Sequence, residues 1–115
     1  MNETLLISTA QGVTAQEMQT VVRALSSCFS GKSRGTVFAF GSRVKGGFRK
    51  NSDLDLWMDL APPPTLADLA ELRRAFEESD IPYSIDLLDA SRTPPEVLNS
   101  IQALLVHDGL KILEL

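Results

Sequence analysis

The chain has 115 residues, of which 43% are hydrophobic, and it carries a formal net charge of −4 at pH 7 with a pI of about 4.9. This length predicts one domain with a buried core, and the acidic balance argues against direct DNA binding. The sequence shows no signal peptide and no apolar run near the roughly 20 residues that cross a membrane. Cys28 is the single cysteine, so no disulfide can form within the chain, and we expect it as a buried thiol on a helix. These features predict a cytoplasmic protein without membrane contact.

The first predicted elements are a helix and a short strand. Thr14 and Glu17 have the spacing of a capping box, and Gly31 is placed to end the helix that they begin. The apolar residues between them recur at helical spacing: Met18, Val21, Val22, Leu25, Cys28 and Phe29. Residues 36–40 are rich in β-formers and predict a short buried strand. Residues 43–47 predict a helical turn after that strand.

A strand of alternating character follows over residues 53–60. Leucine and methionine occupy one face, which predicts the buried side. The other face carries Asp53, Asp55, Trp57 and Asp59. The alternation therefore predicts a half-buried strand with a polar, functional face.

The rest of the chain predicts two helices and two short strands. Three prolines precede a helix that begins at Thr65, and we expect four of its side chains to point inward: Leu66, Leu69, Leu72 and Phe76. Residues 83–88 predict a strand with Asp86 in its middle, whereas Asp89 falls at the strand's end with the opposite parity. Residues 93–96 begin a second helix that Gly109 ends, before an edge strand over residues 110–113. The apolar face of that helix is Val97, Leu98, Ile101, Leu104 and Leu105.

The most informative segment joins a glycine-serine turn to a pair of carboxylates. Gly41-Ser42 follows an apolar strand, in a position where backbone N–H groups can approach phosphate oxygens. Asp53 and Asp55 are two residues apart on a strand and therefore point to the same face. Carboxylates this close repel each other unless a proton or a cation lies between them, and a hard divalent cation such as Mg²⁺ suits the pair.

This segment resembles the signature of the nucleotidyltransferases of the DNA polymerase β superfamily, and the resemblance covers residues 35–90. It implies an α/β (α+β) nucleotidyltransferase fold, with a small mixed β-sheet and helices packed on one face, in which residues 1–115 form a single nucleotidyltransferase domain. It also implies a metal-dependent enzyme with ATP as its substrate and a pair of Mg²⁺ ions as its cofactor. The catalytic and metal-binding residues would be Asp53, Asp55 and Asp86.

The resemblance further assigns the binding of the triphosphate. The turn would cradle the β- and γ-phosphates and the basic loop after it would bind them, through Gly41, Ser42, Arg43, Lys45 and Arg49. Among the basic residues we favour Arg49 and then Lys45, because stand-alone members of the family usually carry basic residues at both places. The chain departs from the family at Gly47, where an acidic residue is frequent.

The chain resembles the MNT-type proteins, which pair with a small helical HEPN-type protein, and its length is consistent with that resemblance. Some of these pairs are toxin–antitoxin systems in which the nucleotidyltransferase transfers AMP to a tyrosine of the toxin. The resemblance thus implies an antitoxin that AMPylates a HEPN-type partner within a hetero-oligomer. Larger relatives carry an additional domain for the acceptor, so we expect a partner or a second subunit to supply the acceptor site. Two alternatives stay open: the catalytic subunit of a two-component enzyme with a small-molecule acceptor, and a non-catalytic antitoxin that neutralises its partner by contact.

Two further side chains have competing interpretations. Trp57, on the aspartate face, either stacks on a base, lies under a partner protein or packs against the basic loop. His107 is the single histidine and has no second ligand nearby, so we expect an interaction with a helix C-terminus rather than a zinc site.

Overall fold

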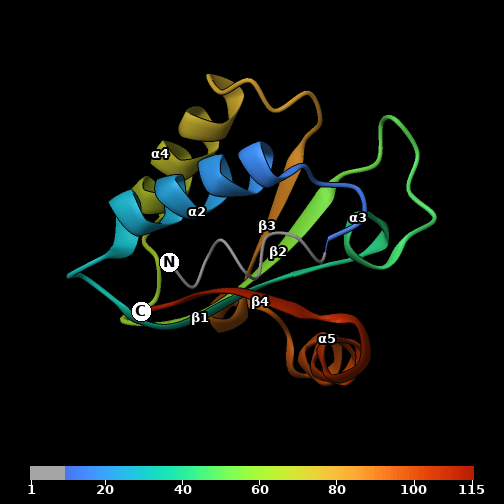
Figure 1. Cartoon of the computed structure of the whole chain (residues 1–115). Helices are drawn as coiled ribbons and strands as arrows, with labels where there is room; N and C mark the ends of the chain where they lie inside the picture. The colour runs from blue at the N-terminus through green and yellow to red at the C-terminus, as the bar shows by residue number, and fades with distance from the viewer. Residues whose placement is uncertain (1–9) are drawn as a thin grey trace.

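The structure of the chain is a computed structural model that describes residues 10–115. The N-terminal residues that bear on a signal peptide lie outside this range. A four-stranded sheet of order β3-β2-β1-β4 organises the fold (Figure 1). Its strands are β1 (Arg34–Phe40), β2 (Leu54–Ala61), β3 (Ile85–Asp89) and β4 (Leu110–Glu114). Strand β1 is antiparallel to β2 and β4, and β2 is parallel to β3, so the expected small mixed sheet of an α/β fold is confirmed.

Two helices cover one face of the sheet: α2 (Ala15–Phe29) and α4 (Leu66–Glu77) (Figure 1). Each begins with a capping box, Thr14 with Glu17 for α2 and Thr65 with Asp68 for α4, which satisfies backbone N–H groups that the first turn leaves free. A short helix, α3 (Ser42–Lys45), follows β1, and a 3₁₀ helix, η1 (Ala90–Arg92), follows β3. Within residues 10–115, no helix is long and apolar enough to span a membrane.

The core lies between the sheet and the pair α2–α4. Leu54, Leu56 and Met58 of β2 are fully buried there, as the alternation of that strand predicts. Leu25 of α2 and Leu72 of α4 meet them from the helical side. These side chains fix the buried face of β2, so its intervening residues must point to the opposite face of the sheet.

Helix α5 (Pro95–Asp108) lies on that opposite side of the sheet, apart from α2 and α4, so the expected packing of helices on one face holds for α2 and α4 only (Figure 1). No residue of α5 is fully buried, and Val106 is 81% exposed. The apolar pattern of α5 therefore predicts the helix but overstates its burial, because α2 and α4 both cover the other face of the sheet (Figure 1). The expectation for Leu66 was wrong as well, since this first residue of α4 is 71% exposed and the buried stripe starts one turn later.

Candidate active site

The sheet topology brings the glycine-serine turn and two of the predicted aspartates together. Phe40, the last residue of β1, is the register neighbour of Asp55, which in turn is the register neighbour of Asp86 on β3. Directly opposite residues of neighbouring strands point to the same face. Asp53 precedes Asp55 by two residues. Asp55 and Asp86 therefore belong to one face and one end of the sheet, next to the turn that follows β1, and Asp53 directly precedes β2 at that end.

Gly41 is required by its close approach to Asp55. Its φ is +87°, a conformation that side chains rarely adopt, and a Cβ atom here would lie 2.4 Å from Asp55 Oδ2. Its carbonyl accepts from the N–H groups of Val44 (3.0 Å) and Lys45 (3.1 Å), which turns the chain into α3. Any side chain at position 41 would thus displace the carboxylate that the sequence predicts at the centre of the site.

Asp55 is the most buried of the three carboxylates, so its environment is the least favourable for a negative charge. It is half-buried, whereas Asp53 and Asp86 are exposed. Burial, then Asp86, then Asp53 raises the pKa of Asp55 to about 6. A carboxylate that is desolvated and repelled by two others gains most from a nearby cation. The donor set, three carboxylates and no nitrogen or sulfur, fits a hard divalent ion such as Mg²⁺.

The structure does not close the three carboxylates into a tight cage. In the described part of the chain, the group of potential metal ligands within 4.8 Å of one another is Cys28, Asp68 and Glu71. Two members of that group have other partners: the Asp68 carboxylate accepts from the Thr65 N–H at the start of α4 and from Lys32 Nζ at 2.8 Å. The Cys28 thiol, half-buried rather than buried as expected, contacts the Asp68 carbonyl at 3.7 Å. We assign no metal to this second group.

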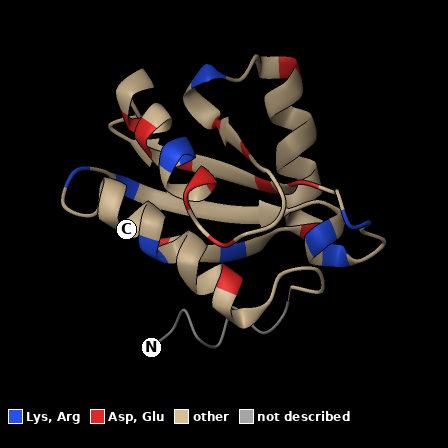
Figure 2. Cartoon of the chain, turned by 90° about the horizontal axis from the view of Figure 1, so that it is seen from above, with Lys and Arg blue, Asp and Glu red and all other residues tan. Residues whose placement is uncertain are grey.

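The predicted phosphate ligands fall into two kinds. The side chains of Lys45 and Arg49 are exposed and make no hydrogen bond or ion pair with another described residue. Figure 2 shows basic residues at the end of the molecule that carries α3 and the loop after it. Arg43, by contrast, is 5% exposed, and its guanidinium donates to main-chain carbonyl oxygens, among them that of Ser52 at 2.7 Å. This placement gives Arg43 a role within the loop in place of the predicted phosphate contact.

Two interpretations of Trp57, stacking on a base and lying under a partner protein, are wrong, and packing against the basic loop stays a prediction. Its side chain is 2% exposed and lies opposite Phe38 and Leu88 in the middle of the sheet, on the face away from α2 and α4. The alternation of β2 correctly places Trp57 on the aspartate face, but α5 lies on that side of the sheet and η1 contacts β2 (Figure 1). The indole is therefore available neither to a base nor to a partner.

Asp89 and His107 lie at other places in the fold. Asp89 is buried and accepts from Ser91 and Arg92, so it serves to begin η1. His107 is exposed in the last turn of α5.

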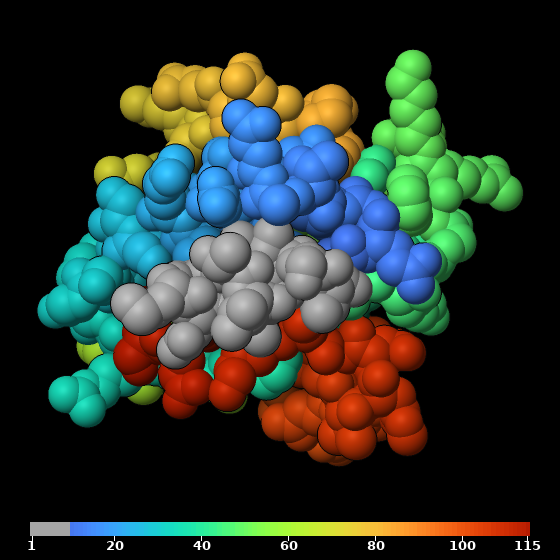
Figure 3. Space-filling model, viewed as in Figure 1, coloured from blue at the N-terminus to red at the C-terminus, as the bar shows by residue number. Residues whose placement is uncertain are grey.

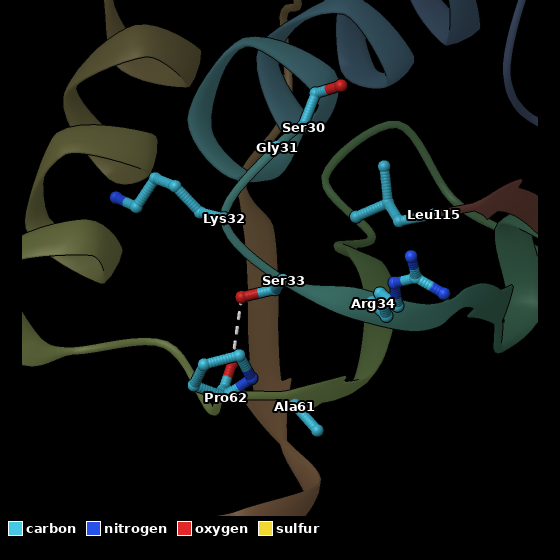
Figure 4. Close-up of a pocket in the computed structure, with 8 residues that line it drawn as sticks. All are labelled: Ser30, Gly31, Lys32, Ser33, Arg34, Ala61, Pro62 and Leu115. Carbon is cyan, nitrogen blue, oxygen red and sulfur yellow. Dashed lines mark hydrogen bonds between the residues drawn. The ribbon is translucent and has the colours of Figure 1, made fainter.

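A separate hollow of about 510 Å³ lies at the other end of β1 and β2 (Figure 4). It is lined by Ser33, Arg34, Pro62 and Leu115, among others, and Ser33 Oγ donates to the Pro62 carbonyl at 2.8 Å. Because Arg34 starts β1 and the aspartates lie near the start of β2, which is antiparallel to it, this hollow is remote from the carboxylates. We assign it no part in the site.

Comparisons with known proteins agree with this geometry. A family model described as "Polymerase beta, Nucleotidyltransferase" matches residues 26–107. Over 71 residues the chain is 44% identical to the "Probable protein adenylyltransferase MntA" of Haemophilus influenzae, a match that spans 62% of this chain and 62% of that relative. A solved structure described as "Crystal structure of the toxin-antitoxin with AMP-PNP" is similar with a TM-score of 0.67 and 18% identity, over 85% of this chain and 73% of that one. At this identity the structural likeness shows a shared fold.

Proposed function

Because this chain belongs to the polymerase beta nucleotidyltransferase family, we propose that it transfers AMP from ATP to a hydroxyl group of a partner protein. The observation that carries the proposal is the position of Asp55. This carboxylate lies against Gly41 of the turn and beside Asp86, and its pKa is raised to about 6 by burial and by the neighbouring carboxylates. Nucleotidyl transfer needs such a concentration of negative charge to hold cations against a triphosphate.

Each part of the site then has a role. Asp53, Asp55 and Asp86 would hold Mg²⁺, which when bound neutralises phosphate charge and helps to stabilise the attacking and leaving oxygens. The exposed carboxylate of Asp86 would accept the proton of the acceptor hydroxyl as its oxygen attacks the α-phosphorus and pyrophosphate leaves. The backbone of Gly41 and Ser42 would approach the outer phosphates, and Lys45 and Arg49 would bind their oxygens by charge-assisted hydrogen bonds.

For the acceptor we propose a tyrosine of a HEPN-type toxin, with this chain as the antitoxin in a hetero-oligomer. Two comparisons support this choice: one relative is named as a probable protein adenylyltransferase, and the structure that shares the fold is a toxin–antitoxin complex with AMP-PNP. Trp57 has no place in the contact with the partner, because it is buried.

Co-expression with the neighbouring gene product, followed by size exclusion and intact mass of both chains, tests the proposal. We expect a complex in which the partner gains the mass of one or more AMP units, and an unmodified partner when Asp55→Asn replaces the wild type. AMP found on a small molecule would instead favour the two-component enzyme. A complex that forms equally well with either variant and never carries AMP would favour an antitoxin that acts by contact alone.

ATP binding is expected to depend on a divalent cation. Without a divalent cation, the negative triphosphate would approach three negative carboxylates and be repelled. Mg²⁺ held by Asp53 and Asp55 would replace that repulsion with an attraction. Titration calorimetry with ATP, first in Mg²⁺ and then in EDTA, measures the difference. Equal affinity under both conditions would exclude the metal role of these residues.

Arg49→Ala is expected to weaken ATP binding more than AMP binding. The Arg49 side chain is exposed on the loop beside the turn, and a charge-assisted hydrogen bond to an outer phosphate contributes roughly 1.5–3 kcal/mol, which AMP cannot gain. Calorimetry with both nucleotides gives the two changes, and Arg73→Ala on the exposed side of α4 is the matched control. Equal losses for ATP and AMP would show that Arg49 does not contact those phosphates.

A further inference from the structure

The loop between α3 and β2 has no regular structure of its own. Residues 46–53 contain neither helix nor strand, yet they carry Arg49 and end at Asp53. In the space-filling view this segment projects from one end of the molecule (Figure 3, green). A projecting loop with few apolar contacts opens readily unless specific bonds hold it. The position of two predicted site residues therefore depends on what anchors this loop.

One buried side chain supplies most of that anchoring. The Arg43 guanidinium donates from Nε to the Ser52 carbonyl (2.7 Å) and from Nη2 to the carbonyls of Arg49 (3.2 Å) and Lys50 (2.8 Å). Nη1 donates to the Gly12 carbonyl at 2.7 Å, while the Gly12 N–H donates back to the Arg43 carbonyl at 2.6 Å. Arg43 thus joins the second half of the loop to the segment that precedes α2.

Tyr83 connects the same guanidinium to the strand that carries Asp86. The Arg43 Cζ lies 3.7 Å from the centroid of the Tyr83 ring and 5.2 Å from that of Phe48, so the cation is placed on aromatic faces. The Tyr83 hydroxyl donates to Glu17 Oε1 at 2.9 Å, and the same oxygen accepts from the Thr14 N–H at 3.0 Å. The N-terminal cap of α2 therefore supports the tyrosine, which supports the arginine.

We propose that Arg43 is the positioning residue of the site. It directly follows Ser42, and it sets the place of Asp53 and of Arg49 relative to the Gly41-Ser42 turn by holding the loop from inside. The effect on the loop follows from the contacts alone, and the effect on nucleotide binding rests on the function proposed above. Lysine cannot replace it, because a single ammonium group lacks the planar fork that reaches carbonyls on both sides of the guanidinium and stacks on the ring.

Trypsin cleavage of the metal-free, nucleotide-free protein tests the effect on the loop. Lys45, Arg49 and Lys50 are exposed cleavage sites in or beside it, and cleavage of an opened segment reports how often it opens. We expect Arg43→Lys to raise the rate of cleavage there by about tenfold or more, since several hydrogen bonds to a charged donor are lost. Arg73→Lys on α4, the matched control, should leave the rate unchanged.

Tyr83→Leu keeps the test decisive if Arg43→Lys fails to fold. It removes the ring under the guanidinium and the bond to Glu17 without touching the loop, and we expect faster cleavage of the same peptide bonds. Wild-type cleavage of the loop in every variant that folds, with melting temperature as the check on folding, would overturn the proposal.

A double-mutant cycle tests the consequence for the nucleotide. If Arg43 positions Arg49, the loss of ATP affinity caused by Arg49→Ala should shrink severalfold when Arg43→Lys is already present. If the losses of ATP affinity from Arg43→Lys and Arg49→Ala simply add, Arg49 still binds phosphate but Arg43 does not position it, and the proposal is overturned. No loss from Arg49→Ala in the wild-type background would count against the proposed phosphate contact and leave the trypsin result to decide the role of Arg43 in the loop.

Discussion

Asp53→Asn combined with Asp55→Asn is expected to abolish AMP transfer while the protein stays folded. Neutral amides bind Mg²⁺ poorly, and the charge stabilisation that metal ions supply to a phosphoryl transfer is worth several kcal/mol. The rate should therefore fall by about a thousandfold or more. Asp55 alternates with the core residues Leu54 and Leu56 on β2, and Asp53 is exposed just before that strand, so neither belongs to the hydrophobic core and the substitutions should leave the packing intact.

Transfer of AMP to the co-expressed partner, followed by intact mass, measures the loss. Asp59→Asn is the matched control, because Asp59 has the same parity on β2 but is exposed and lies toward the other end of the strand. It should transfer AMP at the wild-type rate. A double variant that retains wild-type transfer would exclude the proposed use of Asp53 and Asp55.

Local sequence signals predicted the elements that depend on neighbouring residues. The Thr14–Glu17 capping box, the buried parity of Leu54, Leu56 and Met58 in β2 and the glycine after α5 each act within a few residues, and each holds in the structure. The mixed sheet came from the family resemblance, since neither alternation nor caps state which strands pair. Strand pairing then explains why Asp55 meets Asp86, which lies 31 residues away in the chain.

The errors concern residues whose environment is made by distant parts of the chain. Trp57 has the parity of the aspartates, yet its burial depends on segments that follow β3. Arg43 stands among basic residues in the sequence, but in the structure its guanidinium also meets the Gly12 carbonyl and the Tyr83 ring, which are distant in the chain. Nothing within residues 41–56 separates Arg43 from Lys45 or Arg49 as a phosphate ligand. The role of Tyr83 was missed for the same reason, because its partners lie on α2 and α3.

The raised pKa of Asp55 predicts how the stability of the metal-free protein changes with pH. The folded state holds this proton more tightly than the unfolded state between the ordinary pKa of 3.8 and about 6. The contribution of Asp55 to the free energy of unfolding therefore falls as pH rises through that window. Above about pH 6 the protein bears the full loss of stability that comes from ionising Asp55 in the folded state. Burial is the largest cause of the shift, followed by Asp86 and Asp53. Asp55→Asn removes the ionisable group and should remove the penalty with it.

Thermal melts of the metal-free wild type and Asp55→Asn across pH 4–8 check this expectation. The variant should melt higher than the wild type at pH 7–8, and the difference should shrink steadily toward pH 4, where the wild-type carboxyl is protonated. A free-energy difference of about 1 kcal/mol moves the melting temperature of a domain in this size range by roughly 2–8 °C, so the effect is measurable.

Saturating Mg²⁺ should raise the melting temperature of the wild type at pH 7–8 but not that of the variant. Asp59→Asn, the exposed control on the same strand, should show neither the pH-dependent gain nor the loss of the Mg²⁺ effect. The melting temperature of Asp55→Asn minus that of the wild type should be larger at pH 7.5 than at pH 5. The opposite order would contradict a raised pKa of Asp55.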